Sequence, residues 1–138
     1  MTRKIVRSTV AAVLVLILAT NSALAATAVP FSYTVDFKVN LPGREMTSST
    51  GTFCNWFHTT YVQRPDLDTW VWITLYEPGG DYGYGIQVGN TLYYRADGLW
   101  HAACWSNFQP NTVYFFRYQK NNNTFSIRGE GNVQNHPG

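Results

Sequence analysis

FSYTVDFKVN, residues 31–40, alternates apolar and polar side chains along its whole length. Because successive side chains of a β-strand point to opposite faces, this pattern predicts a half-buried strand. Pro42 and Gly43 end it, and further β-prone runs follow, separated by turn residues at roughly ten-residue intervals. We expect these runs at residues 51–60, 69–77, 85–88, 91–95, 99–105, 112–120 and 124–133. Seven to eight short strands without a helical period predict an all-β fold, an antiparallel β-sandwich or small barrel.

The segments between these runs carry specific turn signals. Gly89-Asn90 separates two β-prone runs by two residues, which is the signal of a tight β-hairpin. The polar stretch 44–50 is typical of a loop. Gly129 and Gly131, in the last run, indicate a bulge or a close backbone approach.

Residues 1–25 have the composition of an export signal. Arg3, Lys4 and Arg7 give a basic start, residues 10–19 form an apolar run too short to span a bilayer comfortably, and residues 23–25 supply a small-x-small cleavage site. Cleavage after Ala28 is an alternative. We expect a secreted, extracellular protein with no membrane span after signal removal. Its parts are then a cleaved signal (1–25), a flexible N-terminal segment (26–30), a β-sandwich domain (31–133) and a disordered tail (134–138).

The charge of the exported part argues against nucleic-acid binding. The whole chain has 10 basic and 8 acidic side chains, a formal charge of +2. Without the three basic residues of the signal, seven basic side chains remain against eight acidic ones, a charge of −1. Neutralising a phosphate backbone needs a basic face, so we expect no nucleic-acid partner.

Cys54 and Cys104 are the two cysteines of the chain. An exported chain matures where thiols oxidise, so we expect one disulfide between them. Both fall in mid-strand, and the bond is therefore expected to tie either two sheets or two neighbouring strands. Their wide spacing lacks the C-x-x-C pattern of a reactive thiol pair.

No catalytic or metal-binding set stands out. His58, His101 and His136 lie in different segments without a short ligand spacing. His101 is expected to be a paired or surface histidine, and His136 to lie in the disordered tail. The sequence has no G-x-S-x-G, no S-x-x-K and no phosphate-cradling glycine loop. We therefore expect no enzyme activity, no metal and no cofactor.

The pattern of aromatic residues is the one candidate functional feature that stands out in this sequence. In the run 69–77, Trp70, Trp72 and Tyr76 share one strand face, and the aliphatic residues share the other. If the aliphatic face packs inward, the three rings form an exposed platform for a glycan, a peptide or the apolar surface of a partner. Alternatively, both faces are covered, or Trp70 and Trp72 form the core themselves.

Two other segments are candidates for binding. Residues 81–85 contain Tyr82 and Tyr84 among glycines, a composition found in antibody binding loops. Val29 and Pro30 lie in a short apolar segment that could insert into a partner's groove or extend a sheet. The candidate binding residues are therefore Trp70, Trp72, Tyr76, Tyr82, Tyr84, Val29 and Pro30.

YFFRYQK, residues 114–120, places Tyr114, Phe116 and Tyr118 on one face, which we assign to the core because the other face contains Arg117. Together with IRGEGNV, residues 127–133, and the signal, this run resembles small secreted single-disulfide β-sandwich proteins of Gram-positive bacteria, including adaptor-type subunits of secreted antibacterial toxin particles. The resemblance implies a protein-binding role and transfers no catalytic residue.

The sequence thus predicts a secreted bacterial binding domain without enzyme activity. It would engage another secreted or cell-surface protein, as an adaptor in a toxin-type extracellular assembly. One alternative is a carbohydrate-binding module that holds a glycan on Trp70, Trp72 and Tyr76. Another is an inhibitor of a secreted hydrolase that inserts the loop at residues 77–85.

Overall fold

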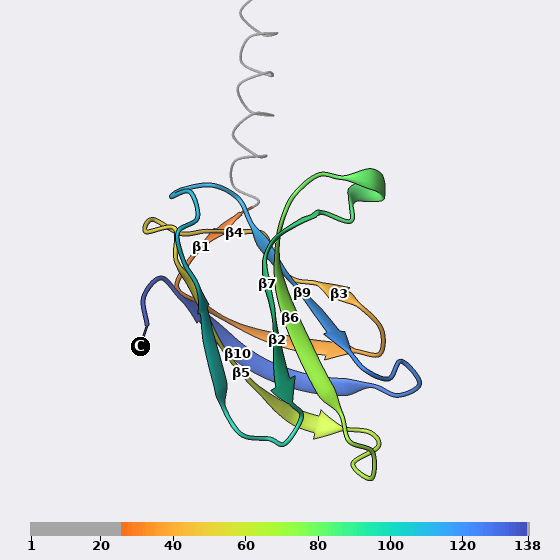
Figure 1. Ribbon diagram of the computed structural model, residues 1–138. Helices are drawn as coiled ribbons and strands as arrows, with labels where there is room; N and C mark the ends of the chain where they lie inside the picture. The colour runs from red at the N-terminus through yellow and green to blue at the C-terminus, as the bar shows by residue number, and fades with distance from the viewer. Residues whose placement is uncertain (1–25, 138) are drawn as a thin grey trace, which may run out of the picture.

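The alternating segment that begins the domain forms an edge strand of a four-stranded sheet. The computed structural model describes residues 26–137, so the expected export signal lies outside the described residues. Sheet I is antiparallel, and its strand order is β2–β10–β5–β8 (Figure 1). Its strands are β2 (Phe31–Phe37), β10 (Ile127–Gln134), β5 (Phe53–Val62) and β8 (His101–Trp105).

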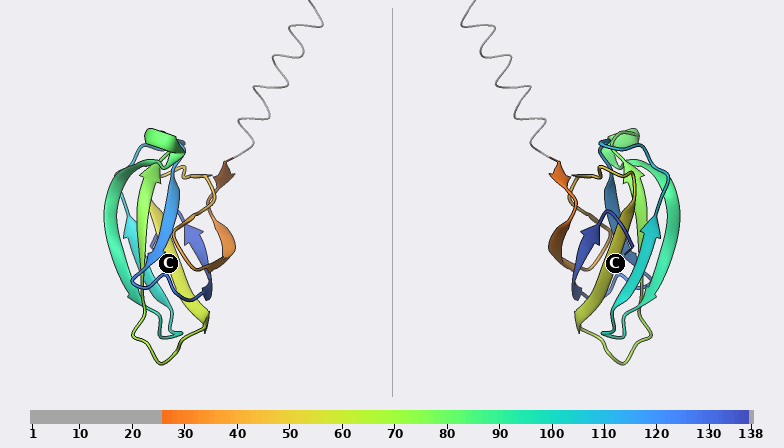
Figure 2. Two further views of the ribbon diagram at one scale, coloured as in Figure 1. Left: turned by 90° about the vertical axis from the view of Figure 1, so that its right-hand side faces the viewer. Right: turned by 90° about the vertical axis from the view of Figure 1, so that its left-hand side faces the viewer.

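Sheet II packs against sheet I as the second layer. Its strand order is β3–β9–β6–β7, also antiparallel. Figure 2 shows the two layers from the side, with β6 and β7 in green on one side and β2 and β10 in orange and dark blue on the other. Its strands are β3 (Leu41–Pro42), β9 (Phe115–Lys120), β6 (Trp70–Glu77) and β7 (Ile86–Arg95).

The predicted antiparallel β-sandwich is therefore confirmed. The described residues contain ten strands, of which three are two-residue pairings and seven are longer. Two of the short ones, β1 (Thr27–Ala28) and β4 (Met46–Thr47), pair with each other in parallel. A single 3₁₀ turn, η1 (Asp81–Gly83), lies between β6 and β7. No helix within residues 26–137 is long and apolar enough to cross a membrane.

The core fills the space between the two sheets. Val71, Ile73 and Leu75 of β6 are completely buried. Phe53 of β5 is also completely buried, and Phe57 of the same strand is 1% exposed. Burying such side chains stabilises the fold by about 1.5–3 kcal/mol each. The predicted core triplet of residues 114, 116 and 118 is confirmed, since each of the three side chains is 5% exposed or less.

The predicted hairpin at Gly89-Asn90 is wrong, because β7 runs unbroken through it. Gly89 instead allows the indole of Trp105 to approach the strand, and a Cβ atom there would lie 2.6 Å from the indole Cδ1. The indole N–H donates a hydrogen bond to the Asn90 carbonyl at 2.8 Å. A glycine required for close packing and a glycine required for a turn look the same in sequence. Gly129 lies at a register shift of β10 and against Phe57, as expected.

The segment 26–30 is attached to the fold, whereas we expected it to be flexible. The amide of Thr27 donates to the Glu45 carbonyl and the amide of Val29 to the Thr47 carbonyl, both at 2.9 Å. Val29 is also buried, with 7% of its surface exposed. An apolar side chain that finds a place in the core fixes the short segment that carries it.

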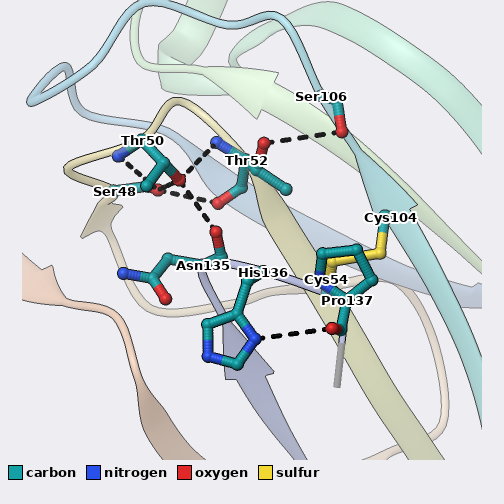
Figure 3. The surroundings of a disulfide bond; sticks show 9 residues. All are labelled: Ser48, Thr50, Thr52, Cys54, Cys104, Ser106, Asn135, His136 and Pro137. Carbon is teal, nitrogen blue, oxygen red and sulfur yellow. Dashed lines mark hydrogen bonds between the residues drawn. A yellow bond between two sulfur atoms is a disulfide. The ribbon is translucent and has the colours of Figure 1, made fainter.

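The predicted loop at residues 44–50 contains β4 and buries Met46 completely. Beyond β4, side-chain hydrogen bonds hold the chain (Figure 3). The hydroxyl of Ser48 donates to the Thr52 carbonyl at 2.7 Å, and the hydroxyl of Thr50 donates to the Asn135 carbonyl at 2.8 Å. Residue 135 belongs to the tail that we expected to be disordered, and Gln134 is the last residue of β10.

Cys54 and Cys104 form the predicted disulfide (Figure 3). The two residues are direct partners in the β5–β8 ladder, so the bond joins neighbouring strands of one sheet. Cys54 is buried and Cys104 is exposed. The disulfide therefore fixes the register of the edge strand β8 rather than joining the two layers.

Reducing this disulfide, or replacing both cysteines by serine, is expected to lower the free energy of unfolding by about 4 kcal/mol. The bond closes a loop with a sequence separation of 50 residues and so restricts the unfolded chain. Urea denaturation of the oxidised and reduced forms measures the difference. A stoichiometric free thiol in the unfolded, unreduced protein would contradict the pairing.

Three tyrosines carry their hydroxyl groups into the interior. The hydroxyl of Tyr33 donates to the side-chain oxygen of Asn55 at 2.6 Å, and the side-chain nitrogen of Asn55 lies 3.5 Å from the hydroxyl of Tyr118. Tyr94 is 6% exposed, and its hydroxyl has no hydrogen-bond partner among the described residues. Burial raises the pKa of all three phenols, that of Tyr118 to about 12.

The raised pKa of Tyr118 predicts alkaline destabilisation. The phenol of Tyr118 loses its proton near pH 10 in the unfolded chain and only at about pH 12 in the folded chain. The contribution of this residue to the free energy of unfolding is therefore complete below pH 10 and is lost as the pH rises from about 10 to about 12. The loss is about 3 kcal/mol for this residue alone. Urea denaturation from about pH 8 to pH 12 measures it. Tyr118→Phe should give a shallower decline, and an equally steep decline in that variant would refute the assignment.

Candidate functional site

The outer side of sheet II carries an exposed group of aromatic residues. The aliphatic residues of β6 point into the core, so Trp70 and Trp72 point outward. Tyr93 of β7 is the register partner of Trp72, and the two ring centroids lie 5.8 Å apart. Trp70 is 38% and Tyr93 64% exposed, whereas Trp72 is half-buried between its neighbours. With Tyr84 and Arg95, these residues form what we call the aromatic face.

Hydrogen bonds hold the two indoles in place. The indole N–H of Trp72 donates to the side-chain oxygen of Gln119 at 2.6 Å. The indole N–H of Trp70 donates to Asp68 at 3.3 Å, and the guanidinium of Arg95 pairs with the same carboxylate at 3.0 Å. Because these side chains are already ordered in the free protein, they lose less conformational entropy when a ligand binds.

Tyr76 supports the aromatic face from below rather than belonging to its surface. We expected it to stand beside Trp70 and Trp72, but only 8% of it is exposed. The ring of Tyr84 packs edge-on against Tyr76 at 5.8 Å, and Phe115 stacks beside it at the same centroid distance. The loop between β6 and β7 therefore covers the end of the platform that the sequence predicts.

Arg117 attaches this loop to the sheet. Its guanidinium carbon lies 3.6 Å from the ring centroid of Tyr84, and its Nε donates to the Tyr84 carbonyl at 2.7 Å. A second bond runs from Arg117 to the side-chain oxygen of Asn40 at 3.0 Å. Arg117 is 7% exposed, and among residues 26–137 it forms no ion pair. Carbonyl oxygens and aromatic ring faces stabilise this buried charge in place of a carboxylate.

The loop places its two tyrosines differently. Tyr84 is 42% exposed, and its hydroxyl accepts hydrogen bonds from Asn40 at 3.0 Å and Gln119 at 3.4 Å. Since Gln119 also binds the indole of Trp72, Tyr84 is continuous with the aromatic face. Tyr82 is fully exposed at the tip of the loop, in η1.

The remaining predicted residues lie elsewhere. Val29 is in the core, and Pro30 is exposed between β1 and β2, not on sheet II. Neither Tyr93 nor Arg95 is among the binding residues predicted from the sequence. The false hairpin at Gly89 paired the two halves of β7 with each other, which concealed that β7 lies antiparallel to β6 with Tyr93 opposite Trp72.

Two of the three histidines, His58 and His101, are paired with carboxylates. His58 Nε2 lies 2.9 Å from Glu130, and His101 Nε2 lies 2.8 Å from Asp97, where the contact lowers the pKa of that carboxyl group. Within the described part of the chain, no group of three or more His, Cys, Asp or Glu side chains is placed to hold a metal ion.

Comparison with known proteins does not assign the chain to a family. No protein-family model and no curated protein matches the sequence. The chain is similar in structure to a mitogen from Yersinia pseudotuberculosis, with 12% identity, a TM-score of 0.43, and coverage of 80% of this chain and 88% of that one. For a family 16 carbohydrate-binding module the identity is 12% and the TM-score 0.39, with 75% and 74% covered.

A third similar structure is a family 61 carbohydrate-binding module in complex with β-1,4-galactotriose, at 12% identity and a TM-score of 0.31, with 75% of this chain and 66% of that chain covered. Values this low transfer neither a ligand nor a role to this protein. Of the resemblance drawn from the sequence, the structure bears out the β-sandwich and the single disulfide. The Gram-positive origin and the toxin-adaptor role stay predictions.

Replacing Arg117 should loosen the loop at residues 79–85. Arg117→Met leaves the Tyr84 carbonyl and Asn40 without their donor, so we expect a loss of about 2 kcal/mol in the free energy of unfolding and faster amide exchange in this loop. Arg117→Lys keeps the charge without the forked donors, so its stability and its amide exchange should lie between those of wild type and Arg117→Met. Hydrogen–deuterium exchange followed by mass spectrometry measures the loop directly. Unchanged exchange at residues 79–85 in Arg117→Met would refute this role.

Proposed function

We propose that this protein is a secreted, non-enzymatic binding domain that engages another protein through its aromatic face. The observation that supports the proposal is a preformed group of Trp, Tyr and Arg side chains on the exposed side of sheet II. These three residue types dominate the energetic hot spots of protein interfaces. Trp70 and Arg95 are register partners, as are Trp72 and Tyr93, so the group is contiguous across two neighbouring strands.

The surroundings of the aromatic face also suit a protein interface. Polar residues border it: the Asn121 side chain accepts from the Trp70 amide at 3.1 Å and donates to the Asp68 carbonyl at 3.0 Å. An apolar centre with a polar, solvated rim is the usual anatomy of such interfaces. The Cys54–Cys104 disulfide suits an oxidising extracellular location, and that location, export and the adaptor role are all part of the proposal.

The glycan alternative fits this face less well. A sugar platform on Trp70, Trp72 and Tyr76 needs three exposed rings in line, and Tyr76 lies beneath Tyr84. The inhibitor alternative depends on the loop tip, where Tyr82 projects alone. The inhibitor alternative gives a distinct outcome in the following experiment.

The test is affinity capture from the culture medium of the source organism. The full chain is produced with its own leader and a tag after residue 138, which follows β10 in sheet I and so leaves sheet II free. We expect wild type to recover a partner protein in stoichiometric amount. The double variant Trp70→Ala/Tyr93→Ala should weaken that capture at least about tenfold. Both side chains are substantially exposed, so unfolding should change by no more than about 1 kcal/mol.

Two control variants make the result specific. Trp100→Ala removes a half-exposed tryptophan that lies outside sheet II and should leave capture unchanged. Tyr82→Ala should also have little effect, and a loss of capture in that variant alone would favour the inhibitor alternative. Recovery of the monomer without a partner, or full capture by the double variant, would overturn the proposal.

A further inference from the structure

The outer side of sheet I contains a polar groove that the proposed function does not use. Its volume is about 480 Å³, within the range of small-molecule sites. The lining side chains include Ser32, Thr34, Arg44, Trp100, Glu130 and Asn132.

The register of β2 and β10 builds the floor of this groove. Ser32 lies opposite Asn132, and Thr34 lies opposite Glu130. Tyr33 and Val35 point toward the core, so the alternating residues Ser32 and Thr34 point outward. The floor is therefore a flat strip of two hydroxyls, one carboxylate and one amide.

Trp100 forms one wall of the groove. Its side chain is 53% exposed and stacks on the ring of His58, with the centroids 4.0 Å apart and the planes at 30°. His58 is in turn bonded to Glu130 at 2.9 Å, while half of the Glu130 side chain remains exposed. The indole and the carboxylate are thus positioned relative to each other before any ligand arrives.

Arg44 also lines the groove. Its guanidinium carbon lies 5.0 Å from the ring centroid of Phe31, which orients this exposed cation. The groove therefore combines one indole face with one cation, one carboxylate, an amide and two hydroxyls. Charges of both signs disfavour a strongly anionic or cationic ligand. A purely apolar ligand would leave the polar groups of the floor without hydrogen-bond partners.

We propose that this groove binds a neutral saccharide of one or two rings. The apolar C–H face of a sugar ring can stack on Trp100, and its hydroxyls can donate to Glu130 and accept from Arg44 and Asn132. The site lies on the opposite layer from the aromatic face and does not rest on the proposed protein partner. It also differs from the sugar platform predicted at Trp70, Trp72 and Tyr76.

The experiment uses cellobiose, maltose, lactose and di-N-acetylchitobiose as probes, each up to about 10 mM, a range that includes weak affinities. Saturation-transfer NMR detects binding, and titration of tryptophan fluorescence gives the association constant. We expect at least one neutral saccharide to bind. Trp100→Ala should lower its association constant about tenfold, and Glu130→Gln should lower it less, because glutamine still has an oxygen that can accept from a sugar hydroxyl.

Trp70→Ala is the matched control, since it removes an exposed indole from sheet II. It should leave saccharide binding unchanged, just as Trp100→Ala should leave protein capture unchanged. Thermal unfolding confirms that each variant is folded, and Glu130→Gln keeps the test valid should Trp100→Ala fail to fold. Glucuronic acid and glucosamine, titrated in the same way, serve as charged comparison sugars. Three results would overturn the site: no binding by any neutral probe, binding lost in Trp70→Ala but kept in Trp100→Ala, or stronger binding of a charged sugar than of the neutral ones.

Discussion

The burial of Val71, Ile73 and Leu75 fixes the orientation of β6 and, with it, the side chains that sheet II exposes. All three are completely buried between the layers, and a strand that buries one face must expose the other. A slip of one residue in β6 would place Trp70 and Trp72 in the core and three aliphatic side chains in water. The aromatic face thus follows from the same packing that stabilises the sandwich.

The two outer sides of the sandwich offer different chemistry. On sheet II, aromatic rings gather over two strands and are held by hydrogen bonds to Gln119 and Asp68. On sheet I, a single indole stands beside a strip of polar side chains with balanced charge. Arg117 and Arg44 have comparable surroundings on the two sides, since the guanidinium of each lies over an aromatic ring and neither forms an ion pair within residues 26–137. One small domain can therefore present two independent binding surfaces.

Much of this architecture follows from local patterns in the sequence. Alternation located β2 and β6 and identified the core triplet at residues 114, 116 and 118, because strand periodicity is a local property. The burial of Tyr76 beneath Tyr84 and the position of Tyr93 opposite Trp72 depend on contacts between distant segments. Gly89 was misassigned for the same reason: the indole that requires it comes from the other sheet. The groove on sheet I likewise needs the β2–β10 register, which no single segment encodes.

The proposed function requires that the outer side of sheet II contacts the partner. Hydroxyl-radical footprinting with mass spectrometry tests it most directly, because it measures side-chain exposure residue by residue in the free protein and in the captured complex. We expect modification of Trp70 and Tyr93 to fall strongly in the complex, while Trp100 and Tyr61, both exposed and outside sheet II, react as before. Protection confined to residues 26–30, to Tyr82 or to Trp100, with Trp70 and Tyr93 still reactive, would contradict the account.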